Sequence, residues 1–443
     1  MNGGKANRLT LFFIIFFVSF IVSTHYCLSF ADASPSHLPM LLPNQQGVPS
    51  IGDQNLKLEL IAQGLYRPTS IAFLGPDDIL VLEKDNGTVR RIVDGTVLAE
   101  PLLDVSVATR SERGMLGIAV ARQETTKPIY VFLYYTESNG NRDGVDSSIG
   151  EEPLGNRLYR YELVDNKLVN PKLLLDLPAT PGHMHNGGVT LVGPDNNVYL
   201  VIGDVKGSNP QEEESSLDGR SSILMINQDG EAVDRKGILG DRHPLNKYYA
   251  YGIRNSFGMD FDPLTGNLWD TENGPGFGDE INLVEPGFNS GWKEVQGVWK
   301  AESYSGGSVI SGHPDNLEDF GGKGEYSMPE FTWESPVGVT AVKFLNSQKL
   351  GKEYQNDMFV GDINNGNLYR FDLTEDRRDL AVDNQLEDKI VHKGDDLENI
   401  IFGKGFNGGG TSFVGISDIE VGPDGYLYIV SFGQGAIYRI IPR

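Results

Sequence analysis

The sequence predicts an all-β fold, a six-bladed β-propeller of four-stranded antiparallel sheets. A pattern of alternating apolar residues, a Gly/Pro/Asp turn and an aromatic-rich run recurs six times along the chain. Apolar alternation with period two indicates strands, and the frequent turn residues exclude a helical array. Repeats of roughly fifty to eighty residues with this pattern are typical of one blade each. The six copies begin near Ser70, Gly117, Val189, Met259, Ala341 and Ser417.

The ends of the repeats indicate how the ring closes. Three copies finish on similar short strands, Leu158-Tyr-Arg-Tyr, Leu368-Tyr-Arg-Phe and Ile437-Tyr-Arg-Ile. The segment from Leu56 to Ile61 precedes the first copy and has an alternation of its own. Because an open edge strand needs protection, we expect this segment to pair with residues 436–441 and complete the last blade. Loops at the repeat starts then converge at one end of a central channel, where we expect the functional residues.

The N-terminal residues differ from the repeats. Lys5 and Arg8 precede a long apolar run, and Ala31-Asp-Ala33 offers a cleavage site between small residues. Residues 1–33 are therefore predicted to be a signal peptide; an uncleaved membrane anchor is the alternative, because the run is nearly long enough to span a bilayer. Residues 34–55 contain several prolines and are predicted to be a flexible tether. Residues 56–443 are the predicted propeller domain.

Charge and cysteine content narrow the classes of function. The formal net charge of −24 disfavours nucleic acid and anionic membranes as partners, so the membrane contact we expect is the possible N-terminal anchor. The single cysteine, Cys27, lies in the targeting segment, so a mature chain would have no disulfide or thiolate chemistry. These features favour a secreted or otherwise extracytoplasmic protein.

A histidine motif flanked by glycines, Gly182-His-Met-His-Asn-Gly-Gly, precedes the third repeat. Glycines allow close backbone approach, so His185 can present an imidazole at the channel mouth and take a proton at neutral pH. A histidine beside a strand is also commonly structural, and both interpretations stay open. His183 and His185 point the same way in an extended segment, but no Asp, Glu or Cys in that segment completes a zinc site.

Two later segments carry groups that the scaffold does not require. Arg254 and Asn255 open the fourth repeat, and a cation beside an amide suits a ligand rich in carboxylates or carbonyls. An arginine that braces loop carbonyls explains the same pattern. Gly274-Pro275 lies in a carboxylate-rich segment, where its turn exposes carbonyl groups suited to calcium. An ordinary β-turn explains this pair equally well.

Seven motifs follow one another along the chain, namely Gly64-Leu-Tyr-Arg-Pro-Thr-Ser-Ile, Glu112-Arg-Gly-Met-Leu-Gly, His185-Asn-Gly-Gly, Ile202-Gly-Asp, Tyr251-Gly-Ile-Arg-Asn, Glu280-Ile-Asn-Leu and Gly287-Phe-Asn-Ser-Gly-Trp. Taken in this order, they resemble the glucose/sorbosone dehydrogenase family. The resemblance covers about Leu58 to Ile441. This family consists of soluble six-bladed quinoproteins that use pyrroloquinoline quinone (PQQ) and calcium, so the resemblance implies both cofactors.

The resemblance implies a role for each matching residue. His185 matches the general base that removes the hydroxyl proton of an aldose or related alcohol while hydride passes to the quinone. Arg254 and Asn255 match a pair that contacts the quinone, and Glu112 matches a polar residue near the sugar and the cofactor. Gly274-Pro275 matches the carbonyl ligands of an active-site calcium. The implied partners are a small-molecule sugar or alcohol and an external electron acceptor.

The chain departs from the family at the residues that hold the three carboxylates of the cofactor. The glucose-oxidising members use a lysine in the fifth blade, and the corresponding cofactor-facing position here is Asn364. They use an Arg-x-Arg pair in the sixth blade, which falls on Gly415 and Ser417. Neutral groups therefore replace three cations, and Arg254 and Lys404 are the basic residues left to contribute.

Two other functions remain alternatives to an exported PQQ-dependent sugar dehydrogenase. The missing cations favour a propeller without catalysis that binds a carbohydrate or a protein surface. A calcium-dependent hydrolase such as a lactonase would need ionised carboxylates that converge on the metal. The candidates for that set are Glu112, Glu272 and Asp362.

Overall fold

The computed structural model describes residues 47–121, 128–212, 217–298, 314–383, 386–392, 397–411 and 413–443. The chain divides into two compact units, residues 1–44 and 45–443, and every described residue belongs to the second. The predicted signal peptide or anchor, residues 1–33, lies outside the described residues. Within the described ranges, no helix is both long enough and apolar enough to cross a membrane.

Strands dominate the described residues, as the alternating pattern predicts, and they form six sheets of four to six strands. The first sheet contains β3 (Pro68–Gly75), β4 (Asp78–Glu83), β5 (Thr88–Val93), β6 (Thr96–Val97) and β7 (Leu103–Asp104). The second contains β8 (Met115–Ala121), β9 (Ile129–Glu137), β10 (Gly155–Val164) and β11 (Lys167–Leu177). The third contains β12 (Thr190–Val192), β13 (Val198–Ile202), β14 (Ser222–Ile226), β15 (Tyr248–Tyr251), β19 (Phe288–Asn289) and β20 (Glu325–Tyr326).

The later sheets follow the same order along the chain. The fourth contains β16 (Ser256–Phe261), β17 (Leu268–Glu272), β18 (Asp279–Val284), β21 (Phe331–Trp333) and β26 (Ile390–Val391). The fifth contains β22 (Val339–Phe344), β23 (Met358–Asp362), β24 (Leu368–Leu373), β25 (Leu380–Ala381), β27 (Ile401–Lys404) and β1 (Ser50–Ile51). The sixth contains β28 (Ile416–Val421), β29 (Leu427–Ser431), β30 (Ala436–Pro442) and β2 (Leu56–Gln63).

The prediction of four strands in every sheet holds for the second and sixth sheets and is wrong for the others. The additional strands are short pieces of long insertions and of the N-terminal segment that pair with strands already in place. Two copies do not end on the Tyr-Arg strand as predicted. In these the motif marks the third strand, β10 or β24, and an outer strand, β11 or β27, follows it in the sheet.

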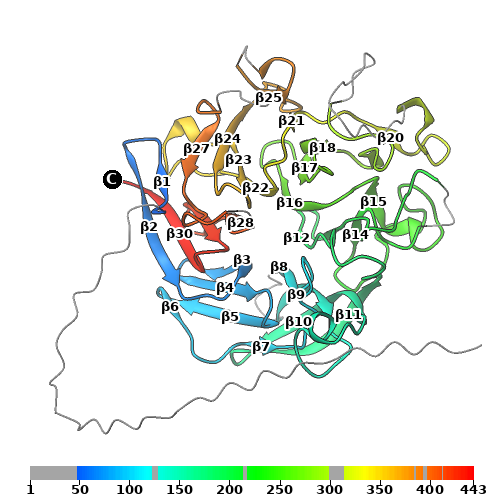
Figure 1. Ribbon diagram of the computed structural model, residues 1–443, viewed down its shortest axis with the longest axis horizontal. Helices are drawn as coiled ribbons and strands as arrows, with labels where there is room; N and C mark the ends of the chain where they lie inside the picture. The colour runs from blue at the N-terminus through cyan, green and yellow to red at the C-terminus, as the bar shows by residue number, and fades with distance from the viewer. Residues whose placement is uncertain are drawn as a thin grey trace, which may run out of the picture. The chain divides into compact units, whose positions relative to one another are not determined.

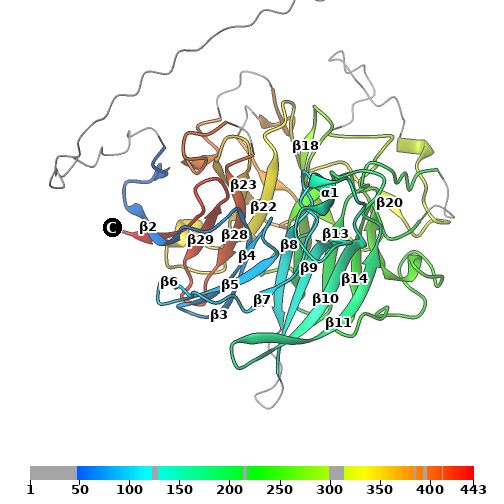
Figure 2. The ribbon, with the colours of Figure 1, turned by 60° about the horizontal axis from the view of Figure 1, so that its bottom comes forward.

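Within residues 45–443, the sheets are arranged around a common centre (Figure 1). The first strands are neighbours in a closed circle: β3 contacts β8, then β12, β16, β22 and β28 follow, and β28 contacts β3. This is a β-propeller arrangement, so the prediction of an all-β propeller is confirmed. The remaining described elements are short, namely α1 (Val145–Ser148), η2 (Leu245–Lys247), η3 (Pro314–Asn316) and η4 (Lys352–Tyr354). Figure 2 shows α1 at the upper end of the sheet that contains β8 and β9.

The core lies between neighbouring sheets. Each hydrophobic cluster combines residues from two adjacent sheets; Phe132 and Leu200, for example, come from the second and third. Sheets that are covered on both faces need apolar residues on both faces, which explains why all but the first residue of β4 are buried. The core therefore fixes the sheets against one another and leaves the loops at their ends free to carry polar groups.

The N-terminal part of this unit closes the last sheet, as the sequence predicts. β2 pairs antiparallel with β30, and Leu58 lies opposite Ile440. The tether predicted for residues 34–55 is wrong at its C-terminal end. There β1 pairs with β27, with Ser50 opposite Lys404, because Ile51 packs against the core between the fifth and sixth sheets.

Candidate active site

The candidate site lies where loops before the first strands meet loops after the second strands. Glu112, His185 and Asn255 precede β8, β12 and β16, whereas Asp204 and Gly274 follow β13 and β17. In an antiparallel pair, the start of one strand and the end of the next lie at the same end of the sheet. The circle of first strands therefore brings together loops that are far apart in the sequence.

His185 is buried and hydrogen-bonded to a buried carboxylate. Its Nδ1 lies 2.6 Å from Asp204 Oδ1, and both side chains are 2% exposed. Asp204 also accepts the backbone N–H of Lys206 at 2.8 Å and the indole N–H of Trp292 at 2.8 Å. The other ring nitrogen of His185, Nε2, has no hydrogen-bond partner among the described residues. A carboxylate beside Nδ1 favours a proton on that nitrogen, which leaves Nε2 as the proton acceptor.

The charge of Asp204 follows from its partners. Burial opposes ionisation, but the hydrogen bonds from His185, Lys206 and Trp292 outweigh it and hold the pKa of Asp204 below its ordinary value. Asp204 is therefore ionised at neutral pH and can stabilise a positive charge that develops on the imidazole.

The backbone at His185 is strained and closely packed. Its φ of 63° is a left-handed conformation that costs free energy for a residue with a side chain. Its N–H donates to Glu112 Oε2 at 2.5 Å, which ties this residue to the loop before β8. Gly203 lets the next loop approach, because a Cβ at that position would lie 2.7 Å from the carbonyl oxygen of His185 and 2.3 Å from that of Arg254.

Glu112 joins two of the predicted site residues directly. The same oxygen that accepts the His185 N–H also accepts the side-chain amide of Asn255 at 3.2 Å. The Oδ1 atom of Asn255 is buried and has no partner within the described part of the chain. Asn255 is thus oriented by Glu112 with an unused acceptor.

Arg254 is also buried and anchored from several sides. Its backbone N–H donates to Glu272 Oε1 at 2.7 Å, and its Nη1 donates to the carbonyl of Asn273 at 2.6 Å. The guanidinium lies over the ring of Trp292 at 5.2 Å. Burial lowers the pKa of Arg254, although nearby carboxylates oppose the shift, and Nε has no partner among the described residues.

Asp279 holds the loop that carries Gly274-Pro275. Its Oδ1 accepts the N–H of Gly274 at 2.8 Å, and its Oδ2 accepts the N–H of Gly338 at 2.7 Å. The neighbouring Asn273 donates its N–H to the carbonyl of Asn255 at 2.8 Å. This loop is therefore attached to the residues around His185.

The residues present fit both implied cofactors. Buried polar atoms without partners on Arg254 and Asn255 suit a ligand rich in carbonyls and carboxylates, as PQQ is. In the described part of the chain, the carbonyls of Gly274 and Pro275 accept no hydrogen bond, and calcium prefers such oxygens. No group of three or more His, Cys, Asp or Glu side chains in the described ranges could hold a metal ion, so calcium here would depend on carbonyl ligands.

Asn364, Gly415 and Ser417, which stand where other family members have basic residues, each contribute to the local structure. Asn364 follows β23 and accepts the N–H of Phe413 at 3.4 Å. A side chain at Gly415 would meet the carbonyl of Asp362 at 2.4 Å, and Ser417 donates its hydroxyl to the carbonyl of Pro68. The remaining candidate, Lys404, pairs with Glu398 at the surface.

Three buried carboxyl groups lie on β17 and β18 behind the site. Burial raises the pKa of Asp270 to about 7 and that of Glu272 to about 8, and it raises the pKa of Glu280 well above the ordinary value. Mutual repulsion adds to the shifts of Glu272 and Glu280. Glu272 therefore holds a proton at neutral pH, and Ser290 and the Arg254 backbone are its partners.

Sequence reasoning missed several residues that complete this arrangement. Asp204 and Trp292 stood within recognised motifs, but neither received a role. A carboxylate two residues beyond a fully buried strand was the available signal for Asp204. Nothing in the sequence indicated that Asn273 and Asp279 hold the loop of Gly274.

Comparisons with known proteins agree on one family. The model of the Glucose / Sorbosone dehydrogenase family matches residues 65–439. Aldose sugar dehydrogenase YliI of Escherichia coli (strain K12) is 24% identical over 397 residues, 88% of this chain and 93% of that protein.

Solved structures are similar over most of the chain. A putative oxidoreductase (glucose dehydrogenase) of Thermus thermophilus is 25% identical with a TM-score of 0.64, covering 87% of this chain and all of the other. The PQQ-bound aldose sugar dehydrogenase of Streptomyces coelicolor is 21% identical with a TM-score of 0.62, covering 91% of this chain and all of the other. The match of the family model to most of the chain confirms the resemblance noted in its motifs: this chain belongs to the glucose/sorbosone dehydrogenase family of oxidoreductases.

Proposed function

We propose that this protein is an exported PQQ-dependent dehydrogenase that oxidises an aldose or a related alcohol and passes electrons to an external acceptor. The observation that carries the proposal is the buried His185–Asp204 pair with Nε2 left unpartnered among the described residues. Family membership and the named relatives support the same reaction class. The apolar run and cleavage pattern of residues 1–33 support export.

In this proposal His185 is the general base. A sugar hydroxyl gives its proton to Nε2 as hydride leaves the adjacent carbon, and Asp204 stabilises the resulting imidazolium through Nδ1–H. Glu112 supports the base indirectly, because it holds the backbone N–H of His185 and the amide of Asn255. These residues need no movement to act, since each is already fixed by its neighbours.

PQQ and calcium would bind beside His185, at Arg254, Asn255 and Gly274-Pro275. Arg254 and Asn255 would hold the quinone through their unpartnered atoms, and the carbonyls of Gly274-Pro275 would hold calcium. When bound, PQQ supplies the hydride acceptor, and calcium supplies a Lewis acid that polarises it. Asn364 lies in the neighbouring loop, and we propose it as a further residue on the cofactor side.

The alternatives receive less support. A lactonase-type hydrolase needs ionised carboxylates around a metal, but burial raises the pKa of Glu272 to about 8, so Glu272 holds its proton at neutral pH. The carboxylate of Asp362 already accepts hydrogen bonds from the N–H groups of Asn365 and Gly366 and from the hydroxyl of Tyr369. A binding module without catalysis gives no reason for a strained histidine paired with a buried carboxylate.

We also infer that each of the six sheets is one blade of the propeller. The support is the closed circle of first strands and the presence of core residues between each neighbouring pair of sheets.

Replacement of His185 tests the proposed reaction. In full-length protein supplied with calcium and PQQ, His185→Gln should lower the rate of dye-linked glucose oxidation by about 10² to 10⁴, because proton transfer from the hydroxyl is lost. PQQ affinity should stay near that of the parent, since the role of His185 is proton transfer. His243→Gln, which changes an exposed loop histidine, is the matched control. Undiminished oxidation in the His185 variant rejects the base.

A further inference from the structure

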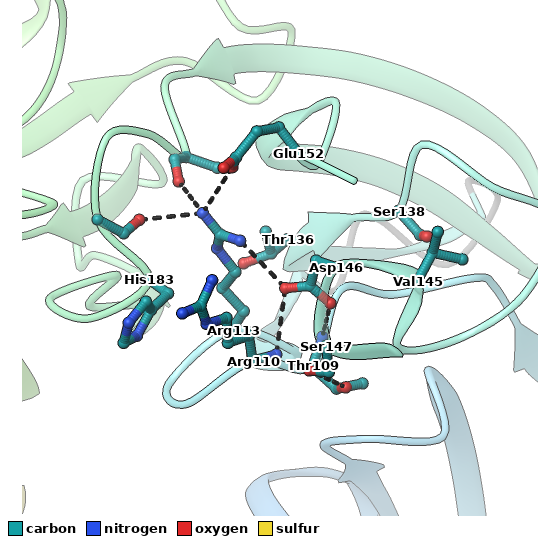
Figure 3. A network of polar contacts seen from close by, with 12 residues as sticks. Thr109, Arg110, Arg113, Thr136, Ser138, Val145, Asp146, Ser147, Glu152 and His183 are labelled. Atoms are coloured by element: carbon teal, nitrogen blue, oxygen red, sulfur yellow. Dashed lines mark hydrogen bonds and ion pairs between the residues drawn. The ribbon is translucent and has the colours of Figure 1, made fainter. Parts of the chain in front are cut away.

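The side chains of Arg110, Arg113 and Lys206 surround the turn that contains Gly182 and His183, beside the candidate active site. Figure 3 shows Arg110 and Arg113 next to His183. Lys206, in the loop after β13, packs against the same turn: the Gly182 N–H donates to the Val205 carbonyl at 3.0 Å, and a Cβ at Gly182 would lie 2.5 Å from Lys206 Cβ.

Buried Arg113 fixes this arrangement. Its Nη2 donates to the carbonyls of Ala179 and Gly182 at 2.7 and 3.0 Å, and its Nη1 pairs with Asp146 at 3.1 Å. Asp146 in turn accepts the backbone N–H of Arg110 at 3.2 Å (Figure 3). The loop of Arg110 and the turn of His183 are thereby held side by side.

Lys206 is directed to the same place by an unusual backbone. Val205 and Lys206 have φ values of 48° and 59°, so two consecutive residues with side chains adopt the left-handed conformation. Such strain persists where the surrounding structure imposes it and is concentrated at functional sites. Burial and the charge of Arg254 lower the pKa of Lys206, whereas Asp204 and Glu112 oppose this, so the ammonium lies within electrostatic reach of the candidate site.

The Arg110 and Lys206 side chains are not neutralised, whereas Arg113 is paired with Asp146. Within the described residues, neither the Arg110 guanidinium nor the Lys206 ammonium has a hydrogen-bond or ion-pair partner. The Nδ1 atom of His183 is buried and unpartnered in the same part of the chain. Elsewhere this acidic chain pairs its cations closely, as in Arg91–Asp78 and Arg370–Asp357, both at 2.6 Å.

We propose that Arg110, His183 and Lys206 form a carboxylate-binding subsite on the rim of the candidate active site. Guanidinium and ammonium groups bind carboxylates through charge-assisted hydrogen bonds, and the His183 ring adds a third polar contact. The subsite adjoins the catalytic candidates directly, because the Glu112 N–H donates to the His183 carbonyl at 3.4 Å.

This inference rests on the proposed function and specifies a ligand group, a carboxylate, that the site would select. The bound carboxylate belongs either to the quinone, whose usual basic partners are replaced here, or to an acidic sugar such as a uronic acid. Both sources have the same chemistry, and the experiment separates them.

The test removes two of the charges in full-length protein. The Arg110→Gln/Lys206→Gln double variant is compared with Arg235→Gln/Lys57→Gln, which removes the same charge from exposed positions away from the site. Two quantities are measured with calcium present: the dissociation constant of PQQ, and the ratio of kcat/KM for D-glucuronate to that for D-glucose. We expect one of them to change by about tenfold or more in the double variant, since each such contact is worth at least a factor of about ten.

The outcomes are separable. Weaker PQQ binding with an unchanged ratio assigns the subsite to the cofactor. A lower ratio with unchanged PQQ binding assigns it to an acidic sugar. Changes no larger than those of the control variant in both quantities overturn the subsite.

A readout without cofactor keeps the subsite distinct from the proposed function. If the parent neither binds PQQ nor oxidises sugars, the function fails. NMR titration of the protein alone with D-glucuronate, with D-glucose as reference, then decides the subsite. Selective glucuronate binding that the double variant loses supports it, and equal response to both sugars refutes it.

Discussion

Asp204→Asn separates the role of the buried carboxylate from its shape. Asp204 accepts three N–H groups: His185 Nδ1–H and the Lys206 N–H at one oxygen, and the Trp292 indole at the other. Asparagine has nearly the same shape but only one acceptor oxygen, so one end of the amide must face a donor. If the NH₂ group faces Trp292, two donors oppose each other. If it faces His185, Nδ1 must accept, and the ring proton moves to Nε2.

Both arrangements weaken the base: the first removes the negative charge that stabilises the imidazolium, and the second places a proton on Nε2. A buried donor left unpaired costs about 1–3 kcal/mol of stability. The misplaced proton abolishes general base catalysis, so kcat should fall by about 10² to 10⁴. PQQ affinity should change little, because the atoms offered to the quinone are on Arg254 and Asn255.

The assay is steady-state oxidation of glucose with an artificial acceptor at saturating PQQ and calcium, together with thermal unfolding and a PQQ titration. The pH dependence of stability gives a second check. The pKa of Asp204 is lowered on folding, so its stabilisation is present above the ordinary value of 3.8 and is lost as the pH falls through the folded value. In the Asp204→Asn variant, the free energy of unfolding should no longer show this loss at acidic pH. A kcat within about threefold of the parent, with folding intact, refutes the reasoning, because a loss of proton transfer must exceed that.

Two further substitutions probe the surroundings of the site. Asn364→Lys should tighten PQQ binding by about tenfold to a hundredfold, since it restores one charge-assisted contact of about 1.5–3 kcal/mol. Asn365→Lys is the control. Equal PQQ titration curves for the two variants would show that Asn364 does not face the cofactor. Glu272→Gln should flatten the pH dependence of stability, because the pKa of Glu272 rises from 4.5 to about 8 on folding and the free energy of unfolding must fall as pH rises through that interval. Denaturant unfolding between about pH 5 and 9 measures that slope, and an identical slope in parent and variant would contradict the raised pKa.

The sequence was informative where a signal is local and periodic. Alternation and turn residues predicted strands, and the extra strand at Leu56 predicted closure against Ile440 because an open edge has to be paired. Additional edge strands such as β1 escaped notice, since a pair of residues is too short to show a period. Their pairing depends on Lys404 and its neighbours, which are distant in sequence.

The candidate site was predictable in part for the same reason. His185 stood out through its flanking glycines, a local signal. The partnership with Asp204 depends on the close approach of loops at Gly203, which no local pattern reveals. The neutral Gly415 was visible in the sequence, but the reason for it, a carbonyl 2.4 Å from where a Cβ would lie, is a property of the folded chain.

The most direct test of the central claim is the absorbance spectrum of the full-length protein after reconstitution with calcium and PQQ and removal of free quinone. The account predicts that quinone is retained and that D-glucose converts its spectrum to the reduced form in the parent. The His185→Gln protein should retain quinone that stays oxidised over the same time. A parent protein that retains no quinone, or one whose quinone is reduced equally fast without His185, would contradict the account.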